Sequence, residues 1–424
     1  MRNVKIGIMG MGTVGSGVYR VIEKEGAYIA HKENIQLEVK KVLALRYSID
    51  IPEEKKAKDV DELANDPEIS IVVEVMGGVE PAMTFITKML KAGKTVVSAN
   101  KELISKHWPE IEKVAKENNV GFYFEASVGG GIPILRAVTD SLQANTITNV
   151  MGIVNGTTNY ILTKMCDEAK DYSEVLKEAQ ELGYAEANPS SDVDGFDAMY
   201  KLSILASMAF HVRLPIDYIY REGIGAITKT DIDFARELGY TVKLLAIARR
   251  EGEHVQMRVH PTMISKDHPL ANVKNSFNAI FLTGSAVGDV MFYGRGAGDL
   301  PTASAIVSDV VYAANASKHK YMTFLNDEKR LSPTLVFEDN FESCYYLRLT
   351  VDDRPGVLAK ITGILGEKQV SLSTVLQREE GANGVTDVIL VTHLAKEKDM
   401  QSAIAKIKEL DEIKDVASLI RVEK

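Results

Sequence analysis

The sequence has little cysteine, no excess of positive charge and no long apolar run. Only Cys166 and Cys344 occur among its 424 residues, which excludes a disulfide framework and fits a reducing compartment. The formal net charge of −9 argues against a nucleic-acid partner, whose phosphates would be repelled. No segment holds about 18 apolar residues free of charge, as a membrane span would. The opening residues, MRNVKIG, have no apolar signal core, so we expect a cytoplasmic protein that binds neither nucleic acid nor membrane.

The composition is that of a globular chain with several domains. Hydrophobic residues make up 45% of the sequence and charged residues 26%, which is typical of folded rather than disordered proteins. A chain of this length exceeds what one compact core usually organises, so two or three domains are expected.

Strand-like and helical segments alternate over residues 1–135. Apolar runs rich in β-branched residues occupy 4–9, 37–45, 69–75, 95–97 and 120–124, and helical spacing occupies 14–23, 81–92 and 108–117. This alternation predicts a doubly wound parallel sheet, the Rossmann arrangement of α/β proteins.

The pattern changes after about residue 135. Longer helical stretches at 173–182 and 193–210 mix with strand-like runs at 146–154 and 255–260, which predicts an α+β domain over 136–325. A polar stretch from Asn326 through Pro333 leads to the last domain, residues 340–424. Its predicted strands lie at 345–351, 370–378, 385–393 and 416–422, with helices to about 368 and at 397–410. The resulting βαββαβ order is ferredoxin-like.

Three glycines follow the first predicted strand with the spacing G-x-G-x-x-G. Gly10 permits a tight turn, Gly12 lets the backbone approach a pyrophosphate, and Gly15 allows the helix to pack closely on the strand. The free N–H groups at the start of the helix, where Thr13 and Val14 lie, suit the phosphate charge. Glycines in turns are often only structural, but the strand, the helix and the position in the chain all agree with a dinucleotide site.

The end of the second strand bears on the choice between NAD and NADP. An NAD enzyme usually has an Asp or Glu there, whereas this chain has Ala44-Leu45-Arg46-Tyr47. The planar fork of Arg46 could pair with a 2′-phosphate, and lysines at 55, 56 and 58 could add charge. The alternative is a solvated arginine at a strand end. The balance favours NADP(H) over NAD(H).

Two segments follow strands of the predicted N-terminal sheet. Ser98 and Lys101 come just after the run 95–97, at the strand end where ligands gather in such sheets, although a lone lysine is more often a surface group. Glu125 precedes a glycine-rich segment ending at Ile132, whose carbonyls could hold a monovalent cation. The alternative is a tight domain crossover, and the residues alone favour the crossover.

A third segment, from Gly183 to Lys201, is rich in acidic residues. Asp197 and Lys201 are spaced i, i+4 at the start of an apolar helix, so their side chains share one face. An exposed ion pair is the common outcome of that spacing. The loop before it, with acidic residues at 186, 192 and 194, favours a site in which the lysine exchanges a proton with a reacting oxygen. The histidines show no metal-ligand spacing.

These segments together resemble the homoserine dehydrogenase family. The run 183–201 is similar to the family signature, and so are GMGTVGSGV (10–18), VEVMGG (73–78), SANKELIS (98–105), VGGGIPI (128–134), VNGTTNYIL (154–162) and YGRGAGDLPTAS (293–304). The resemblance covers nearly all of residues 1–320. The tail resembles an ACT domain through its element order and the segment from Asp353 to Leu358.

The resemblance implies NAD(P)-dependent interconversion of L-homoserine and L-aspartate 4-semialdehyde, in the pathway to threonine, methionine and isoleucine. It implies that Glu186 binds the substrate, that Asp197 orients the reacting side chain, and that Lys201 donates the proton with Lys101 beside it. Residues 136–325 become a substrate-binding and dimerisation domain, and Gly298 approaches the cofactor. Many relatives carry an Asp after the strand-end arginine, whereas Tyr47 stands here, which leaves the NAD/NADP preference open.

The resemblance also implies a cation and an effector. A monovalent cation, Na or K, is expected at Glu125 with the carbonyls of Val128, Gly130 and Ile132. An amino acid, with L-threonine the first candidate, is expected at the ACT turn of Asp353, Pro355 and Gly356, in a homodimer or homotetramer. Three alternatives stay open: another dehydrogenase on the same scaffold, a non-catalytic amino-acid sensor, and a tail that only holds subunits together.

Overall fold

The N-terminal sheet is fully parallel and has the strand order β2-β1-β3-β4-β5. The computed structural model describes residues 1–327, 335–377 and 384–423, so part of the linker 326–333 and residue 378 lie outside the described residues. The elements of this part are β1 (Arg2–Met11), α1 (Thr13–Glu33), β2 (Ile35–Tyr47), α2 (Val60–Ala64), β3 (Ile69–Glu74), α3 (Ala82–Lys91), β4 (Thr95–Ser98), α4 (Lys101–Glu117) and β5 (Phe122–Tyr123). The predicted Rossmann arrangement is confirmed.

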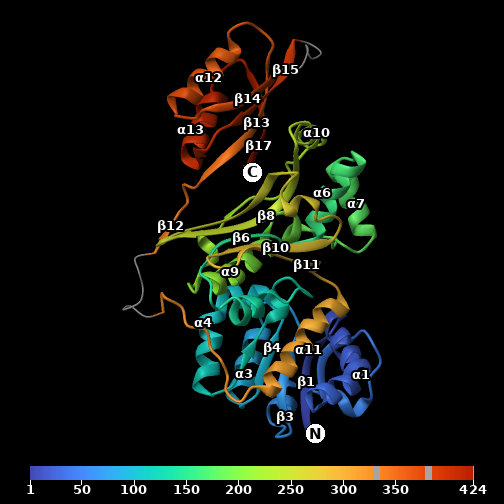
Figure 1. The fold of residues 1–424 in the computed structure, drawn as a ribbon. Coiled ribbons are helices and arrows are strands. Elements are labelled where there is room, and N and C mark those ends of the chain that lie inside the picture. The colour runs from blue at the N-terminus through green and yellow to red at the C-terminus, as the bar shows by residue number, and fades with distance from the viewer. Residues whose placement is uncertain (328–334, 378–383, 424) are drawn as a thin grey trace. The chain divides into compact units, whose positions relative to one another are not determined.

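One helix packed against this sheet comes from far along the chain. Helix α11 (Asp299–Asn315) lies beside α1 (Figure 1), and its apolar face joins the core formed by β1, β2 and α1. A Cβ atom at Gly17 of α1 would lie 2.7 Å from the Asp299 carbonyl oxygen, so the glycine permits this close contact. The periodicity of residues 136–325 did not indicate this return.

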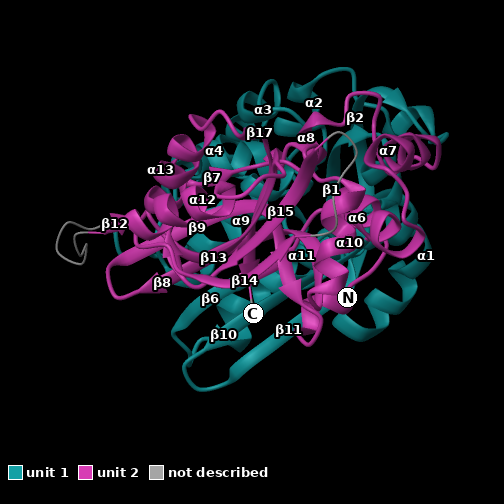
Figure 2. Cartoon of the chain, turned by 90° about the horizontal axis from the view of Figure 1, so that it is seen from above, with its two compact units in different colours: residues 1–150, 197–217, 277–334 teal, residues 151–196, 218–276, 335–424 magenta. Residues whose placement is uncertain are grey.

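The chain divides into two compact units whose segments alternate in sequence (Figure 2). The first contains residues 1–150, 197–217 and 277–334, and the second contains 151–196, 218–276 and 335–424. The remaining elements of the first unit are α5 (Ile134–Arg136), most of β6 (Ile147–Ile153), α9 (Phe196–Phe210) from its second residue, β10 (Phe277–Gly284) and β11 (Gly288–Arg295). Domains drawn as continuous stretches of sequence therefore differ from the compact units of the structure.

The second unit is organised around one long strand, β9 (His254–Ser265). Strand β8 (Tyr240–Glu251) pairs with one edge of β9 along its length. The other edge takes three strands in succession, β12 (Val336–Phe337), β7 (Tyr220–Arg221) and β17 (Ile413–Glu423). The helices of this unit outside its C-terminal part are α6 (Gly156–Glu168), α7 (Tyr172–Glu181), α8 (Ser190–Val193) and α10 (Lys229–Glu237).

The C-terminal part has the predicted βαββαβ order. Its elements are β13 (Glu342–Asp352), α12 (Val357–Glu367), β14 (Leu372–Gln377), β15 (Val385–Thr392), the short β16 (Ala395–Lys396), α13 (Glu397–Lys408) and β17. The strands are ordered β17-β13-β15-β14, and α12 and α13 pack on one face (Figure 1). Alternate residues of β13, such as Tyr345 and Leu347, belong to the core with these helices, whereas Tyr346 and Arg348 bond to Asp231 of α10.

Buried arginines join the C-terminal strands to the rest of the second unit. Arg258 of β9 is fully buried and pairs with Glu423 of β17 at 2.8 Å. Arg348 of β13 bonds to Asp231 at 2.9 Å, and Asp231 is itself fully buried at the start of α10. Removing one partner from such a pair leaves an uncompensated charge, which typically costs about 3–5 kcal/mol. The C-terminal domain is therefore built into the second unit.

Lys243 of β8 is a buried lysine that bonds to two uncharged oxygen atoms. Its side chain donates to Asn159 Oδ1 at 3.0 Å and to the Val273 carbonyl oxygen at 2.6 Å. Burial lowers its pKa from 10.5 to about 8, because the charged form is poorly solvated.

This lowered pKa predicts a pH-dependent stability difference. Between about pH 8 and 10.5 the lysine keeps its proton in the unfolded state and has lost it in the folded state. The free energy of unfolding of wild type should therefore rise with pH in this window, relative to that of Lys243→Met. The gain should be roughly 1 kcal/mol per pH unit, measured by urea unfolding at several pH values. Lys24→Met, which changes an exposed lysine, should show no such slope. If the difference in the free energy of unfolding between wild type and Lys243→Met did not change with pH, the buried, weakly basic state of this lysine would be contradicted.

Candidate active site

The glycine turn after β1 is shaped to accept a dinucleotide. Gly10 has φ +105°, and a Cβ atom there would lie 2.6 Å from the Val75 carbonyl oxygen. A Cβ atom at Gly15 would lie 2.1 Å from the Gly10 carbonyl oxygen, whereas at Gly12 no described atom lies within 4 Å. The first and third glycines are thus required by close packing, and the second faces open space. This is the fit expected for a pyrophosphate at the start of α1.

The end of β2 lies beside this turn. Met11 pairs with Tyr47, and the Ser48 N–H donates to the Met11 carbonyl oxygen at 3.0 Å. Arg46, which is exposed, therefore lies next to the residue pair that joins the end of β2 to the glycine turn. Lys55 donates to the Tyr19 hydroxyl of α1 at 3.2 Å, and Lys56 lies over the Tyr47 ring. Positive side chains gather at this end of the strand.

Asp197 contacts two lysines, one with each carboxylate oxygen. Lys201 Nζ lies 2.7 Å from Asp197 Oδ2, and Lys101 Nζ lies 3.1 Å from Asp197 Oδ1. The Asp197 and Lys201 side chains are only 6% and 10% exposed, whereas that of Lys101 is 41% exposed. The structure thus brings together three residues that the sequence predicted from two distant segments. The i, i+4 pair is not the solvated surface pair of the common alternative.

Buried polar side chains hold the start of the helix that carries Lys101, and one of them, Glu74, was not singled out in the sequence analysis. The Asn100 side chain caps α4 by accepting the Leu103 N–H, and its amide donates to the Gly78 carbonyl oxygen. The Ser98 hydroxyl donates to Glu74 Oε2 at 2.6 Å and accepts the Asn100 N–H. Burial raises the pKa of the fully buried Glu74, while Ser98 and the Met76 N–H oppose this shift. Glu74 lies within VEVMGG, where a charged residue at the end of an apolar strand was the available signal.

The loop that carries Glu186 belongs to the second unit. The Asn155 amide donates to Asp192 Oδ1 at 2.7 Å, and the Thr157 hydroxyl donates to the Tyr184 carbonyl oxygen at 2.6 Å. Gln180 donates to the carbonyl oxygen of Glu186, whose side chain is exposed. Bonds from the start of α6 therefore hold this loop and leave the predicted substrate-binding carboxylate accessible.

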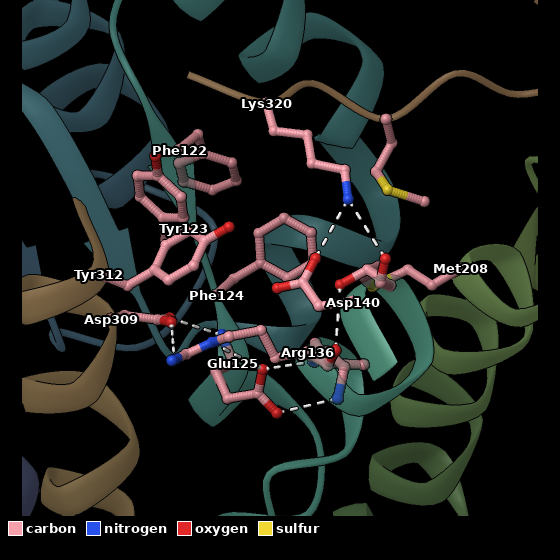
Figure 3. Close-up of a pocket in the computed structure, with 13 residues that line it drawn as sticks. Phe122, Tyr123, Phe124, Glu125, Arg136, Asp140, Met208, Asp309, Tyr312 and Lys320 are labelled. Atoms are coloured by element: carbon pink, nitrogen blue, oxygen red, sulfur yellow. Dashed lines mark hydrogen bonds and ion pairs between the residues drawn. The ribbon is translucent and has the colours of Figure 1, made fainter. Parts of the chain in front are cut away.

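Glu125 lies in a buried cluster beside a small cavity of about 90 Å³ (Figure 3). Its two carboxylate oxygens accept the N–H groups of Leu135 and Arg136 at 2.9 and 2.8 Å. Asp309 of α11 accepts the Glu125 N–H and pairs with the Arg136 guanidinium at 2.6 Å. Burial and the charge of Asp309 raise the pKa of Glu125 to about 7. Four aromatic side chains, two methionines and the pair of Asp140 and Lys320 also line the cavity, whereas the two lysines of the Asp197 centre do not.

The glycine-rich segment after Glu125 contacts the loop that follows β11. The Gly131 N–H donates to the Arg295 carbonyl oxygen, and a Cβ atom at Gly130 would lie 2.4 Å from the Gly296 carbonyl oxygen. A Cβ atom at Gly296 would meet the side chain of Asn278, which is fully buried and has no hydrogen-bond partner among the described residues. Gly298, with φ +117°, precedes the N-terminus of α11. Carbonyl and carboxamide oxygen atoms thus lie close together around these loops.

The predicted effector turn stands at the junction of β13 and α12. Gly356 has φ +95° and precedes the first residue of α12. The Asp353 N–H donates to the Gly384 carbonyl oxygen, and Gln377 donates to Asp353 Oδ1 at 3.0 Å. A left-handed residue at this position is most readily provided by glycine.

Comparison with known proteins identifies the relatives of this chain. Family models match residues 10–125 ("Homoserine dehydrogenase, NAD binding domain"), 133–311 ("Homoserine dehydrogenase") and 345–412 ("ACT domain"). The homoserine dehydrogenase of Bacillus subtilis (strain 168) is 40% identical over 433 residues, covering 100% of this chain and 99% of that protein. The chain belongs to the homoserine dehydrogenase family.

Other homoserine dehydrogenases are similar over the same length. The Pseudomonas aeruginosa protein is 41% identical, with 100% of this chain and 99% of that protein covered. A crystal structure from Thiobacillus denitrificans has a TM-score of 0.92 at 38% identity, covering 100% and 99% of the two chains. A hyperthermophilic archaeal homoserine dehydrogenase in complex with NADPH has a TM-score of 0.63 at 28% identity, covering 75% of this chain and all of that one.

No helix of the described residues is long and apolar enough to cross a membrane. In the same parts of the chain, no three His, Cys, Asp or Glu side chains form a metal-binding group. Neither cysteine forms a disulfide bond; Cys344 is buried and Cys166 is half-buried. The ACT match lies outside the two homoserine dehydrogenase matches of this family member.

The glycine turn yields a prediction with a matched control on the same helix. Gly15→Ala should weaken binding of the nicotinamide dinucleotide at least about tenfold and lower the melting temperature, because its Cβ atom would press on the Gly10 backbone. Gly26→Ala, where no described atom lies within 4 Å, should keep wild-type binding and add about 0.5–1 kcal/mol of stability. Fluorescence titration and thermal unfolding measure the two effects. Equal cofactor affinity in both variants would rule out the tight-turn role of Gly15.

Proposed function

We propose that this chain interconverts L-homoserine and L-aspartate 4-semialdehyde with a nicotinamide dinucleotide. The observation that carries the proposal is the Asp197 carboxylate held between Lys201 and Lys101. Lys101 begins a helix directly after β4, at the carboxyl edge of the cofactor-binding sheet. In doubly wound sheets this edge is where cofactor and substrate meet. Membership of the homoserine dehydrogenase family supplies the reaction class.

The two lysines have different tasks in this reaction. Lys201 is nearly buried at the start of α9, and its ammonium group donates the proton to the aldehyde oxygen during reduction. In the reverse direction the free amine accepts that proton from the hydroxyl group of homoserine. Lys101, more exposed, adds a positive charge that stabilises negative charge developing on the same oxygen. Asp197 orients both, and the nicotinamide cofactor, when bound, supplies or accepts the hydride.

Glu186 binds the amino group of the substrate in this proposal. Its carboxylate is exposed on a loop that the start of α6 holds by hydrogen bonds. An ammonium group is attracted to such a carboxylate, whereas an aldehyde or a hydroxyl group is bound less strongly. Glu186 thereby selects an amino-acid substrate.

The proton-transfer role of Lys201 is tested by substitution. Lys201→Ala should lower kcat by about 10²–10⁴-fold and leave the NADPH dissociation constant nearly unchanged, because a positioned acid contributes about that factor. Steady-state reduction of aspartate semialdehyde and an NADPH titration measure the two quantities. Lys106→Ala, which removes an exposed lysine paired with Glu102 on α4, should keep wild-type rates. A Lys201→Ala enzyme with more than roughly a tenth of wild-type kcat would refute the assignment.

NADP(H) is the preferred cofactor in this proposal. Arg46 is exposed beside the glycine turn, and lysines at 55 and 56 lie near it on the same side of the cofactor domain. A planar guanidinium matches a phosphate with two parallel hydrogen bonds. The similar archaeal enzyme whose structure contains NADPH agrees with this choice.

Arg46→Ala measures the contribution of this arginine. The variant should bind NADPH about 10–150-fold more weakly, the range for a hydrogen bond to a charged group, and bind NADH almost as wild type does. Parallel titrations with the two cofactors give the ratio. A wild-type enzyme that prefers NADH would reject the interpretation before any substitution is made.

A monovalent cation, Na or K, is proposed at Glu125 with the carbonyl oxygens of Val128, Gly130 and Ile132. All four positions offer oxygen atoms, which alkali cations prefer. Gly130 packs against Gly296, and Gly296 packs against the carboxamide of Asn278, which has no hydrogen-bond partner among the described residues. The Glu125 carboxylate already accepts two backbone N–H groups, so it would contribute charge and a remaining lone pair. The cation would fix the two glycine loops next to Gly298.

Regulation by an amino acid, with L-threonine the first candidate, is proposed through the ACT domain in a homodimer or homotetramer. The turn of Asp353, Pro355 and Gly356 presents backbone groups beside the start of α12, as a small ligand requires. Inhibition requires that the effector bind one conformational state of the enzyme better than the other. Deleting the domain is a poor test, because Arg258 and Asp231 would lose their buried partners.

A further inference from the structure

Glu74, at the carboxyl end of β3, is fully buried and forms no ion pair with a lysine or arginine of the described residues. Its carboxylate oxygens accept the Ser98 hydroxyl at 2.6 Å and the Met76 N–H at 2.9 Å, and the Gly77 N–H and the Asn100 amide are further donors. All four donors are uncharged. A buried carboxylate is normally paired with a cation, because removing a lone charge from water is costly. This carboxylate therefore lacks the counter-charge that the buried acidic residues of the second unit have.

Glu74 is located at the ligand-binding edge of the N-terminal sheet. Its strand lies between β1, which leads into the glycine turn, and β4, which leads to Lys101. Val75, the next residue, packs against the turn, since a Cβ atom at Gly10 would lie 2.6 Å from the Val75 carbonyl oxygen. Ser98, which donates to Glu74, is the last residue of β4. Glu74 thus lies between the turn that suits a pyrophosphate and the start of α4.

The order of the strands assigns the two halves of a dinucleotide to the two sides of β1. In doubly wound sheets the pyrophosphate lies at the turn after the first strand, and the adenosine ribose lies at the end of the second strand. Here β2 is on one side of β1, and β3 and β4 are on the other. The nicotinamide half therefore extends over the carboxyl ends of β3 and β4, where Glu74 and Lys101 are found.

We propose that the Glu74 carboxylate makes the protein favour the oxidised form of its cofactor over the reduced form, an inference that rests on the proposed reaction with a nicotinamide dinucleotide. Transfer of a hydride, two electrons and a proton, to the aldehyde carbon leaves the nicotinamide ring with one positive charge, while the aldehyde oxygen takes its proton from Lys201. The negative charge of Glu74 stabilises the charged ring through the protein interior and has no such effect on the uncharged reduced ring. Glu74 thereby assists hydride transfer to the aldehyde without touching the substrate.

The other cations of the proposed reaction have carboxylates elsewhere. The substrate ammonium group is assigned to Glu186, which belongs to the second unit, and the monovalent cation is assigned to Glu125. The positive ring is the cation that remains for Glu74. Burial raises the pKa of Glu74 and its four hydrogen-bond donors lower it, so a positive ring nearby acts in the same direction as the donors and holds the carboxylate in its charged form.

The ratio of two dissociation constants tests this role of the charge. Full-length wild type, Glu74→Gln and Glu74→Asp are titrated calorimetrically with NADP⁺ and NADPH, or with NAD⁺ and NADH if wild type binds these more tightly. In Glu74→Gln the dissociation constant of the oxidised form should rise about 5–30-fold relative to that of the reduced form, the size expected for one unit charge at an effective dielectric constant near 20. Glu74→Asp keeps the charge and should keep the ratio within about twofold.

Glu68→Gln is the matched control for the loss of one carboxylate charge. Glu68 immediately precedes β3, so it lies at the opposite end of the strand, about 20 Å from Glu74 along the chain. Its side chain is 54% exposed. Solvent and salt screen a charge at that distance, so Glu68→Gln should show the same ratio of the two dissociation constants as wild type.

The ratio separates an effect of the charge from an effect on structure. Equal weakening of both cofactor forms in Glu74→Gln, or failure of this variant to fold, would overturn the inference, because the carboxylate would then only support the ends of β3 and β4. A Glu74→Asp protein whose ratio follows Glu74→Gln rather than wild type would overturn it as well. A wild-type protein that binds neither form contradicts the proposed function itself. An unchanged ratio in variants that bind both forms contradicts only this role of Glu74.

Discussion

The buried pair of Arg258 and Glu423 is the interaction on which the second unit depends. It joins β9, the strand that organises that unit, to β17, the last strand of the ACT fold. A fully buried guanidinium is tolerated only with a carboxylate beside it, so the two segments have to fold onto each other. Arg348 with Asp231 and Arg421 with Glu397 repeat this arrangement nearby. Regulation and structure are therefore difficult to separate here, since the regulatory domain completes the sheet next to it.

The Asp197 centre shows the same principle on the scale of a single site. Three charged side chains meet there because each is positioned by its own local structure. The Asn100 cap positions Lys101 at the start of α4, and one helical turn of α9 positions Lys201 over Asp197. Glu74 and Ser98 complete the arrangement from two neighbouring strands. Such a site retains its geometry before substrate arrives, which is what electrostatic catalysis requires.

The sequence predicted what depends on local order. The Rossmann sheet, the glycine turn, the i, i+4 pair and the βαββαβ tail each leave a periodic or spaced signal within about thirty residues. Long-range returns leave no such signal. Helix α11 packs on α1 through the contact of Ala303 and Asp299 with Gly17, and β17 pairs with β9, from positions that periodicity cannot relate. Glu74 was missed because one acidic residue after an apolar strand reads equally well as a solvated strand end.

The pairing of β9 with β17 also has a consequence for how the protein is made. Glu423 lies 165 residues after Arg258, so a ribosome adding about 5–20 residues per second needs roughly ten to thirty seconds to deliver it. During that interval β9 has β8 on one side, while part of its other edge and the Arg258 guanidinium lack their final neighbours. An open strand edge of this kind attracts other chains. The nascent chain therefore exposes this part of the β9 edge until β17 has been synthesised.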